Sequence, residues 1–162
     1  MITARDIMTR TPILVRMNDR LSKCMDIFIK NQLKFAPVID MNQIVRGTLT
    51  EFSLIRLYTK HVMSGLDDAI GSHSEELGPV NSVNEKDSLS EVISAMKIAL
   101  HERLIVLDDR RHLTGIISPY DVLTFLNQER LRHGTWEKMI AVYEIEAHQS
   151  ILKKLERALK AA

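Results

Sequence analysis

The stretch GIISPYD at residues 115–121 has a counterpart, GTLTEFS, at residues 47–53, and 68 residues separate the two copies. The same offset aligns residues 14–58 with residues 82–126 without a gap. Seven of the 45 aligned pairs are identical: Val15/Val83, Asp19/Asp87, Leu21/Leu89, Ser22/Ser90, Val38/Val106, Asp40/Asp108 and Gly47/Gly115. Many of the other pairs keep their apolar or hydroxyl character. We therefore infer an internal repeat, a feature that has to be found before single elements are assigned.

Both copies show the same order of predicted elements. A short apolar run, ILV at 13–15 or the weaker NSVN at 81–84, predicts a strand. Asp19 or Asp87 then stands where it can cap a helix whose apolar residues recur at helical spacing. KFAPVID and IVRGTLT, like ERLIVLD and HLTGIIS, predict two strands joined by a polar hairpin turn, and a second helix follows. The predicted fold class is α+β, built from two β-α-β-β-α repeats.

The repeats define the expected domain organisation. Residues 1–63 form the first repeat with an N-terminal segment, 64–79 a linker, 80–133 the second repeat, and 134–162 a long C-terminal helix. The linker has three Gly, three Ser and four acidic residues without an apolar period. The tail after Gly134 is rich in good helix formers, and its apolar stripe needs a surface to lie on, either this chain's own body or a second copy.

Composition and charge narrow the classes of function. There are 22 basic and 21 acidic residues, a net charge of +1, so no global field favours nucleic acid or an anionic membrane. Cys24 is the single cysteine, which excludes an internal disulfide and a cysteine-built zinc site. The N-terminus does not read as a signal peptide, and no apolar run is long enough for a membrane span. We expect a soluble, cytoplasmic protein.

The sequence also indicates neither metal binding nor catalysis. His133 with Glu137, and Glu144 with His148, have helical spacing, but two ligands do not make a metal site. No Ser, His and Asp arrangement, carboxylate pair, P-loop or dinucleotide-binding glycine motif is present. We expect no cofactor and no enzymatic activity.

The SPYD step inside the opening stretch has a structural and a functional interpretation. Structurally, Ser118 is a favoured N-cap, Pro119 a favoured first helical residue, and Asp121 completes a capping box. Functionally, the free N–H groups and the hydroxyl make a phosphate cradle, and the Asp121 carboxylate can accept two hydrogen bonds from a ribose diol. Gly115 would allow close approach of a ligand or of a neighbouring backbone. Both interpretations use the same helix terminus.

The duplicated order of elements resembles a tandem cystathionine β-synthase (CBS) domain pair, the Bateman module. In that family each copy ends in Gly, two apolar-leaning positions, Ser or Thr, then two residues and usually Asp. ARDIMTRTPILV and the following residues, including the Pro-Val-Ile-Asp step at 37–40, carry the resemblance in the first copy. It covers roughly residues 4–128.

The resemblance implies a regulatory module that binds AMP, ADP, ATP or S-adenosylmethionine in clefts between the repeats. It implies that Ser118 contacts phosphate and that Asp121 holds the ribose. The base would lie against main chain of the first strand and apolar residues of the second: Asn81, Ser82 and Val83 with Arg103, Leu104 and Ile105. Arg110 and Arg111, in the second hairpin turn, are further candidates for phosphate contact, although a charged turn is often only solvated.

The chain departs from the family pattern at several positions. Ser53 replaces the Asp in the first copy, and Ile105 replaces the Pro in the second. Losing the ribose carboxylate costs about 1.5 to 3 kcal/mol. We therefore expect one competent cleft and one weaker cleft, the latter formed by Thr50, Ser53, Ile13, Leu14 and Pro37.

Two functions remain open at this level. In one, the protein senses an adenosyl ligand and reports it to a separately encoded effector. In the other, it is a dimerisation or docking module whose pocket has degenerated and whose long helix is the working surface. We expect a homodimer in either case.

Overall fold

The computed structural model of the chain describes residues 2–61, 68–99 and 103–133. The helix predicted over residues 134–162, with its apolar stripe and its His and Glu pairs beyond His133, lies outside the described residues.

The two repeats fold alike. The first comprises β2 (Val15–Arg16), α2 (Leu21–Asn31), β3 (Phe35–Ile39), β4 (Val45–Thr50) and α3 (Glu51–His61). The second comprises β5 (Ser82–Asn84), α4 (Leu89–Ile98), β6 (Leu104–Leu107), β7 (Leu113–Ile117) and α5 (Pro119–His133). Three short elements precede the repeats: α1 (Ala4–Ile7) and β1 (Thr9–Arg10) before the first, and the 3₁₀ helix η1 (Ile70–Glu76) before the second. The predicted β-α-β-β-α order and the α+β class are confirmed.

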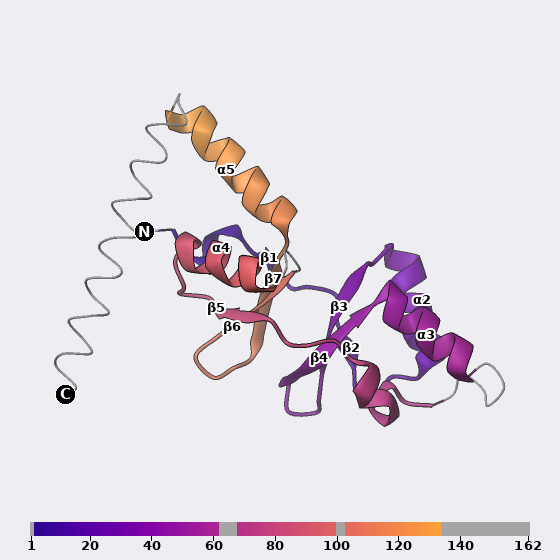
Figure 1. Ribbon diagram of the computed structural model, residues 1–162. Helices are drawn as coiled ribbons and strands as arrows, with labels where there is room; N and C mark the ends of the chain where they lie inside the picture. Colours follow the sequence, from indigo (N-terminus) through magenta and orange to yellow (C-terminus); the bar gives the residue numbers. More distant parts are fainter. Residues whose placement is uncertain (1, 62–67, 100–102, 134–162) are drawn as a thin grey trace.

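Each repeat contains its own small sheet (Figure 1). In both, the first strand runs parallel to the second and the second runs antiparallel to the third. The strand order is β2-β3-β4 in the first repeat and β1-β7-β6-β5 in the second. The register is also repeated, because Val38 pairs with Gly47 and Val106 pairs with Gly115, with a bulge one residue later in each sheet.

The helices of each repeat cover one face of its sheet, and the other face meets the other repeat. Ala36 and Val38 of β3 belong to a core with α2 and α3, and Leu104 and Val106 of β6 belong to a core with α4 and α5. Side chains alternate between faces along a strand. Ile39 and Ile105 therefore point away from the helices, yet they are 1% and 0% exposed. They are buried at the interface between the repeats.

The hairpin turns are closed by one carboxylate in each repeat. Asp40 accepts hydrogen bonds from the N–H groups of Asn42 and Ile44, and Asp108 accepts them from Arg110 and His112. The two turns meet through an isolated bridge between Ile44 and His112.

The predicted caps at Asp19 and Asp87 are wrong by one residue. Helix α4 is capped by Ser88, whose hydroxyl accepts from the Glu91 N–H, and α2 begins after Arg20 without a side-chain cap. Asp19 instead accepts from the Arg16 N–H at 2.9 Å, and Asp87 accepts from the Asn84 N–H at 2.9 Å. These carboxylates close the turn that follows the first strand, which moves each helix start on by one residue.

The segments that precede the two repeats are exchanged between them. Ala4 and Ile7 of α1 are buried in the core of the second repeat, and Ile70 of η1 is buried in the core of the first. The backbone contacts are equivalent: Ala4 N–H donates to the Asp87 carbonyl, and Ile70 N–H donates to the Asp19 carbonyl, both at 2.8 Å. The described part of the predicted linker, residues 68–79, is thus packed on the first repeat.

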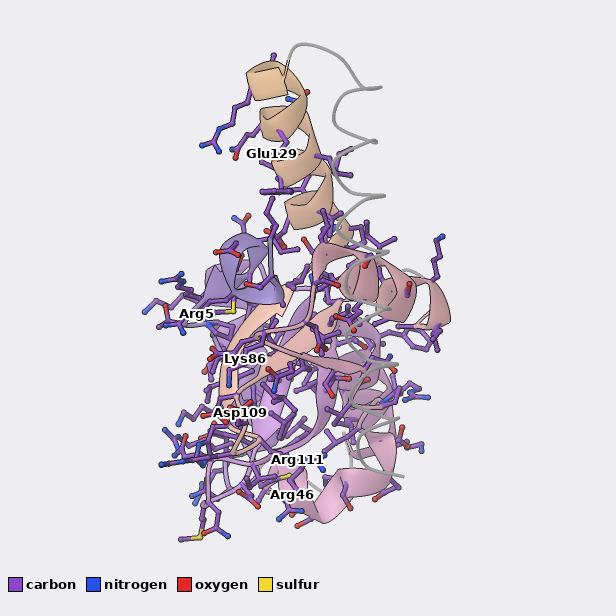
Figure 2. The ribbon with its side chains drawn as sticks, turned by 90° about the vertical axis from the view of Figure 1, so that its left-hand side faces the viewer. Arg5, Arg46, Lys86, Asp109, Arg111 and Glu129 are labelled. Carbon is purple, nitrogen blue, oxygen red and sulfur yellow. The ribbon has the colours of Figure 1, made fainter. Side chains whose placement is uncertain are left out.

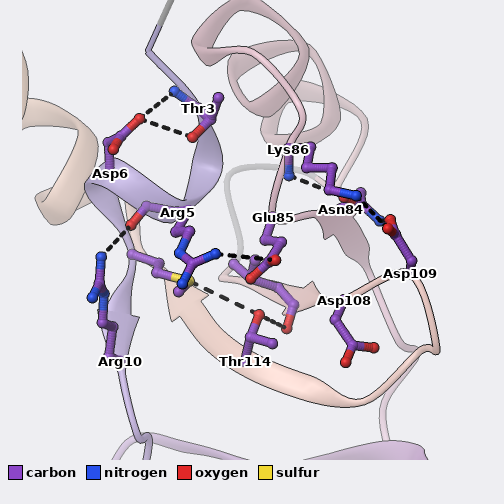
Figure 3. A network of polar contacts seen from close by, with 12 residues as sticks. Thr3, Arg5, Asp6, Arg10, Asn84, Glu85, Lys86, Asp108, Asp109 and Thr114 are labelled. Carbon is purple, nitrogen blue, oxygen red and sulfur yellow. Dashed lines mark hydrogen bonds and ion pairs between the residues drawn. The ribbon is translucent and has the colours of Figure 1, made fainter.

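Polar contacts also hold the exchanged N-terminal segment on the second repeat (Figure 3). Arg5 forms an ion pair with Glu85 at 3.5 Å, and the Arg10 guanidinium reaches the Arg5 carbonyl. β1 pairs antiparallel with β7, Thr9 opposite Ile116 and Arg10 opposite Gly115. Residues 2–10 lie beside α4 and β7, although the sequence division groups them with the first repeat (Figure 1).

Gly47 and Gly115 make this exchange sterically possible. A Cβ at Gly115 would lie 2.6 Å from the Met8 sulfur and 2.9 Å from the Thr9 carbonyl oxygen. A Cβ at Gly47 would lie 2.7 Å from the Leu77 Cβ. Of the two uses considered for Gly115, close approach of a neighbouring backbone is the one realised.

We predict that Gly115→Ala destabilises the protein by about 1 to 3 kcal/mol, because the new methyl group overpacks the contact between β7 and the segment before the first repeat. The difference is measured by urea unfolding. Thr124→Ala, on the exposed side of α5, is the control and should change stability by less than about 0.5 kcal/mol. Equal stability of Gly115→Ala and the parent would contradict this account of the glycine.

We also predict a pH-dependent role for Asp108. The N–H of His112, followed by that of Arg110, lowers the pKa of the Asp108 carboxyl, although desolvation opposes the shift. A folded-state pKa below the unfolded value stabilises the fold above the unfolded pKa, near 3.9, and the stabilisation is lost as pH falls through the folded pKa. Asp108→Ala should therefore lower stability at about pH 7, with a difference that narrows toward about pH 3. Urea unfolding at both pH values measures this, and a constant difference would contradict it.

Candidate functional site

Ser118 and Asp121 form the predicted capping box at the start of α5. The Ser118 N–H donates to Asp121 Oδ2 at 2.7 Å, and the Ser118 hydroxyl donates to the same oxygen. The Asp121 N–H donates back to Ser118 Oγ at 3.2 Å. Both side chains are partly exposed. The structural interpretation of SPYD is therefore confirmed, and one oxygen of the carboxylate is used by it.

The other oxygen of Asp121 faces the exchanged N-terminal segment. The Thr9 hydroxyl donates to Asp121 Oδ1 at 3.3 Å, across 112 residues of sequence. This long contact lies in an exposed position. A ligand hydroxyl can replace that of Thr9 without disturbing the cap, because the cap uses only Oδ2.

The other predicted residues of the second repeat lie at the same end of its sheet. Ser82 pairs with Ile105, and Ile105 pairs with Ile116 on the next strand. Extending the register of β6 and β7 by one residue places Arg103 opposite Ser118. Two strand spacings amount to about 10 Å, so main chain at Asn81 and Ser82 stands within the length of a nucleoside from Ser118.

Burial decides how two of these residues can contribute. Val83 is 7% exposed and its side chain belongs to the helix-facing core, so only its main chain can contact a ligand. Ile105 is fully buried at the interface between the repeats, and its N–H donates to the Asn81 carbonyl at 2.8 Å. The Asn81 carbonyl oxygen therefore already accepts one hydrogen bond within the chain.

The structure does not bring Arg110 and Arg111 to this place. They lie in the hairpin turn before β7, whereas Ser118 follows β7, a strand of 5 residues. At 3.4 Å per residue the two ends are about 17 Å apart. Arg111 is exposed and lies with Arg46 at the end of the molecule far from Glu129 of α5 (Figure 2).

The corresponding place in the first repeat has the same geometry but different chemistry. Thr50 Oγ1 and Ser53 Oγ are 3.0 Å apart, and the Ser53 N–H donates to Thr50 Oγ1 at 3.1 Å. Ser53 is 6% exposed, so its hydroxyl is enclosed as well as uncharged. Pro37 is buried, Leu14 is half-buried, and Ile13 is 43% exposed. Phe35 stands opposite Thr50, where the second repeat has Arg103 opposite Ser118.

A cavity of about 440 Å³ between the repeats includes residues that the sequence analysis did not select. Its lining joins the first repeat to the hairpin of the second: Thr11, Pro12, Leu14, Ile39, Gln43, His112, Leu113 and Thr114. Leu14 is the one predicted site residue among them. The positive φ of 52° at Thr11 turns the chain there. The sequence contained no signal for this cavity, because its walls meet only through the packing of the two repeats.

A larger apolar groove, about 560 Å³, lies on the outer surface of the first repeat between α2 and α3. Phe28, Leu54 and Tyr58 are among its lining residues, with Lys34 and Glu51. Exposed Ile29 and Ile55 belong to it as well, at 74% and 58% exposure. It is separate from the inter-repeat site.

The described residues provide no metal site and no reactive thiol. Among residues 2–61, 68–99 and 103–133, no three His, Cys, Asp or Glu side chains gather to hold a metal ion. Burial raises the pKa of the Cys24 thiol to about 12, so a thiolate is not available there at neutral pH. No helix in these ranges is long and apolar enough to cross a membrane.

Comparison with known families gives one match that covers both repeats. The family model of the CBS domain matches residues 4–60 and 76–128. The match includes the exchanged elements α1 and β1 and both β-α-β-β-α units up to residues 60 and 128, and it includes only Glu76 of η1.

Curated relatives match over a smaller share of their own length. The chain is 29% identical over 106 residues to the human 5'-AMP-activated protein kinase subunit gamma-3, covering 63% of this chain and 22% of that protein. The subunit from Bos taurus is also 29% identical over 106 residues, at 63% and 21% coverage. The chain thus spans about a fifth of the length of these relatives.

Solved structures share the fold over nearly their whole length. A putative acetoin utilization protein (AcuB) from Vibrio cholerae superposes with a TM-score of 0.68 at 22% identity, covering 83% of this chain and 98% of that one. The structure of CBSX2 in complex with AMP gives a TM-score of 0.66 at 19% identity, with 80% and 99% coverage. At these identities the likeness concerns the fold alone.

Proposed function

We propose, from the premise that this chain belongs to the CBS domain family, that it is a non-catalytic regulatory module that binds an adenine nucleotide or related adenosyl ligand between its repeats. The observation that carries the proposal is the grouping at one end of the second sheet. Main chain at Asn81–Ser82, Arg103 and Ser118 stands on or one residue beyond three neighbouring strands, with about 10 Å, two strand spacings, between the outer two. Asp121 is bound to Ser118 through the capping box.

Each part of the ligand has a partner in this arrangement. The phosphate lies at Ser118 and Arg103, beside the N-terminus of the 15-residue helix α5. The ribose diol donates to Asp121 Oδ1, replacing the Thr9 hydroxyl that donates there at 3.3 Å. The base lies against main chain at Asn81, Ser82 and Val83 and beside Ile105. The crystal structure of CBSX2 in complex with AMP supports this ligand class.

The charge of Arg103 favours phosphorylated ligands among the four candidates. Within the described part of the chain no carboxylate forms an ion pair with Arg103. A nucleotide carries the negative charge of its phosphate at the 5′ carbon of the ribose, where S-adenosylmethionine carries a sulfonium cation and has its carboxylate only farther along the methionine chain. AMP, ADP or ATP is therefore preferred over S-adenosylmethionine.

The cleft of the first repeat is the weaker one. Ser53 offers no charge to a ribose, and its hydroxyl is already paired with Thr50. Phe35 stands where a guanidinium would meet phosphate. Ile13, Leu14 and Pro37 remain available only for apolar or main-chain contact with a base.

A regulatory role requires that binding be read by another molecule. Ligand contacts that involve both repeats favour one packing of the repeats over another. We infer that a separately encoded effector reads this packing and that the protein works as a homodimer in the cytoplasm. The gamma-subunit relatives belong by name to a protein kinase, which supports an effector in trans.

Calorimetric titration tests the site. We expect one AMP, ADP or ATP per chain, and Asp121→Ala should weaken binding about 10- to 150-fold because a charge-assisted hydrogen bond is lost. Ser53→Ala, the matched change in the first repeat, should leave the affinity unchanged. Circular dichroism controls for loss of the cap. Two equally tight sites per chain, or unchanged binding by Asp121→Ala, would contradict the proposal.

The alternative function, a dimerisation or docking module with a degenerate pocket, is favoured by a different observation. The apolar groove between α2 and α3 is open, and Ile29 beside it is 74% exposed. A thermal-shift screen separates the two functions, because a ligand at 100 times its dissociation constant adds about 2.7 kcal/mol to stability. If none of the four ligands raises the melting temperature and light scattering gives a dimer, the alternative holds.

A further inference from the structure

Phe35 and Arg103 occupy the same position in the two repeats. They are 68 residues apart, the offset of the internal repeat. Phe35 pairs across its sheet with Thr50, and the register of β6 and β7 puts Arg103 opposite Ser118. The two side chains therefore stand beside the equivalent hydroxyls of the two clefts.

The two side chains also contact one another across the repeats. Phe35 precedes Ala36, and Arg103 precedes Leu104, and these two neighbours face the helices. By strand alternation Phe35 and Arg103 point toward the opposite repeat. The Arg103 Cζ lies 5.9 Å from the centroid of the Phe35 ring, within the range of a cation–π interaction.

The ring is the one side-chain partner of the Arg103 guanidinium within the described residues. Two other arginines, by contrast, meet acids: Arg5 pairs with Glu85 and Arg46 with Asp40. No ion pair or hydrogen bond of the Arg103 side chain occurs among residues 2–61, 68–99 and 103–133. An aromatic face orients a guanidinium without neutralising it, so the positive charge stays available to an anion.

We propose that Phe35 is a positioning residue that holds the Arg103 guanidinium beside Ser118 and so makes phosphate recognition in the second repeat's cleft depend on the first repeat. The inference rests on the proposed function, because it concerns the phosphate of the same ligand. The two repeats then have different roles. The second repeat binds the phosphate through Arg103. The first repeat, which has Ser53 in place of the acid, orients that arginine through Phe35.

This arrangement has a consequence for selectivity. The ring acts on the ligand only through the guanidinium, so it contributes to binding of a phosphorylated nucleoside and not to binding of the nucleoside itself. A merely structural aromatic residue would affect both ligands equally.

Titration of AMP and adenosine against Phe35→Leu tests the proposal. We expect AMP binding about 2- to 30-fold weaker, the range of a cation–π contact, with adenosine binding unchanged. Phe35→Trp, which keeps an aromatic face, should restore AMP binding to within about 2-fold of the parent. In an Arg103→Gln background, Phe35→Leu should have no further effect on AMP affinity.

The possible results separate this inference from the proposed function. Equal weakening of AMP and adenosine, unchanged AMP binding, or a full effect of Phe35→Leu without Arg103 would overturn the role of Phe35 while leaving the nucleotide site in place. A parent protein that binds neither ligand would overturn both. Circular dichroism establishes that each variant is folded, and Phe35→Met replaces Phe35→Leu, with the same expectation, if the latter does not fold.

Discussion

The exchange of leading segments between the two repeats is the interaction on which the rest of this structure depends. Each sheet alone is small, and the outer edge of its third strand needs a partner. β1 pairs with β7, and Gly78 bridges to Thr48 at the matching edge of the first sheet. The segment before each repeat is buried in the core of the other repeat, so the two cores are completed together.

The exchange also shapes the candidate site. It brings Thr9 to the free oxygen of Asp121, and it occupies the space that Gly115 leaves open. In the proposed function, a ribose hydroxyl would compete with the Thr9 hydroxyl for this oxygen. The interface between the sheets adds the contact of Phe35 with Arg103. The proposed ribose and phosphate contacts would both depend on contacts between distant parts of the sequence.

Much of the fold could be predicted because the repeat encodes it twice. The hairpins, the second helices and the Ser118–Asp121 cap were recovered, since each depends on residues a few positions apart. The caps at Asp19 and Asp87 were misplaced because an aspartate can close a turn as well as cap a helix, and the local pattern suits both. Residues 68–79 have no apolar period, so their packing on the first repeat had no sequence signal. Arg110 and Arg111 had the right charge but lie at the wrong end of β7.

By itself, the sequence determined the duplicated β-α-β-β-α order, the two polar hairpin turns, and the asymmetry between Asp121 and Ser53. These features are local, or are differences between aligned copies. Only the tertiary structure decided which segment covers which sheet edge, which oxygen of Asp121 accepts from Thr9, and that Phe35 faces Arg103. Such contacts join residues 68 to 112 positions apart. They form only when the two repeats pack and bury apolar surface together, so no short sequence pattern predicts them.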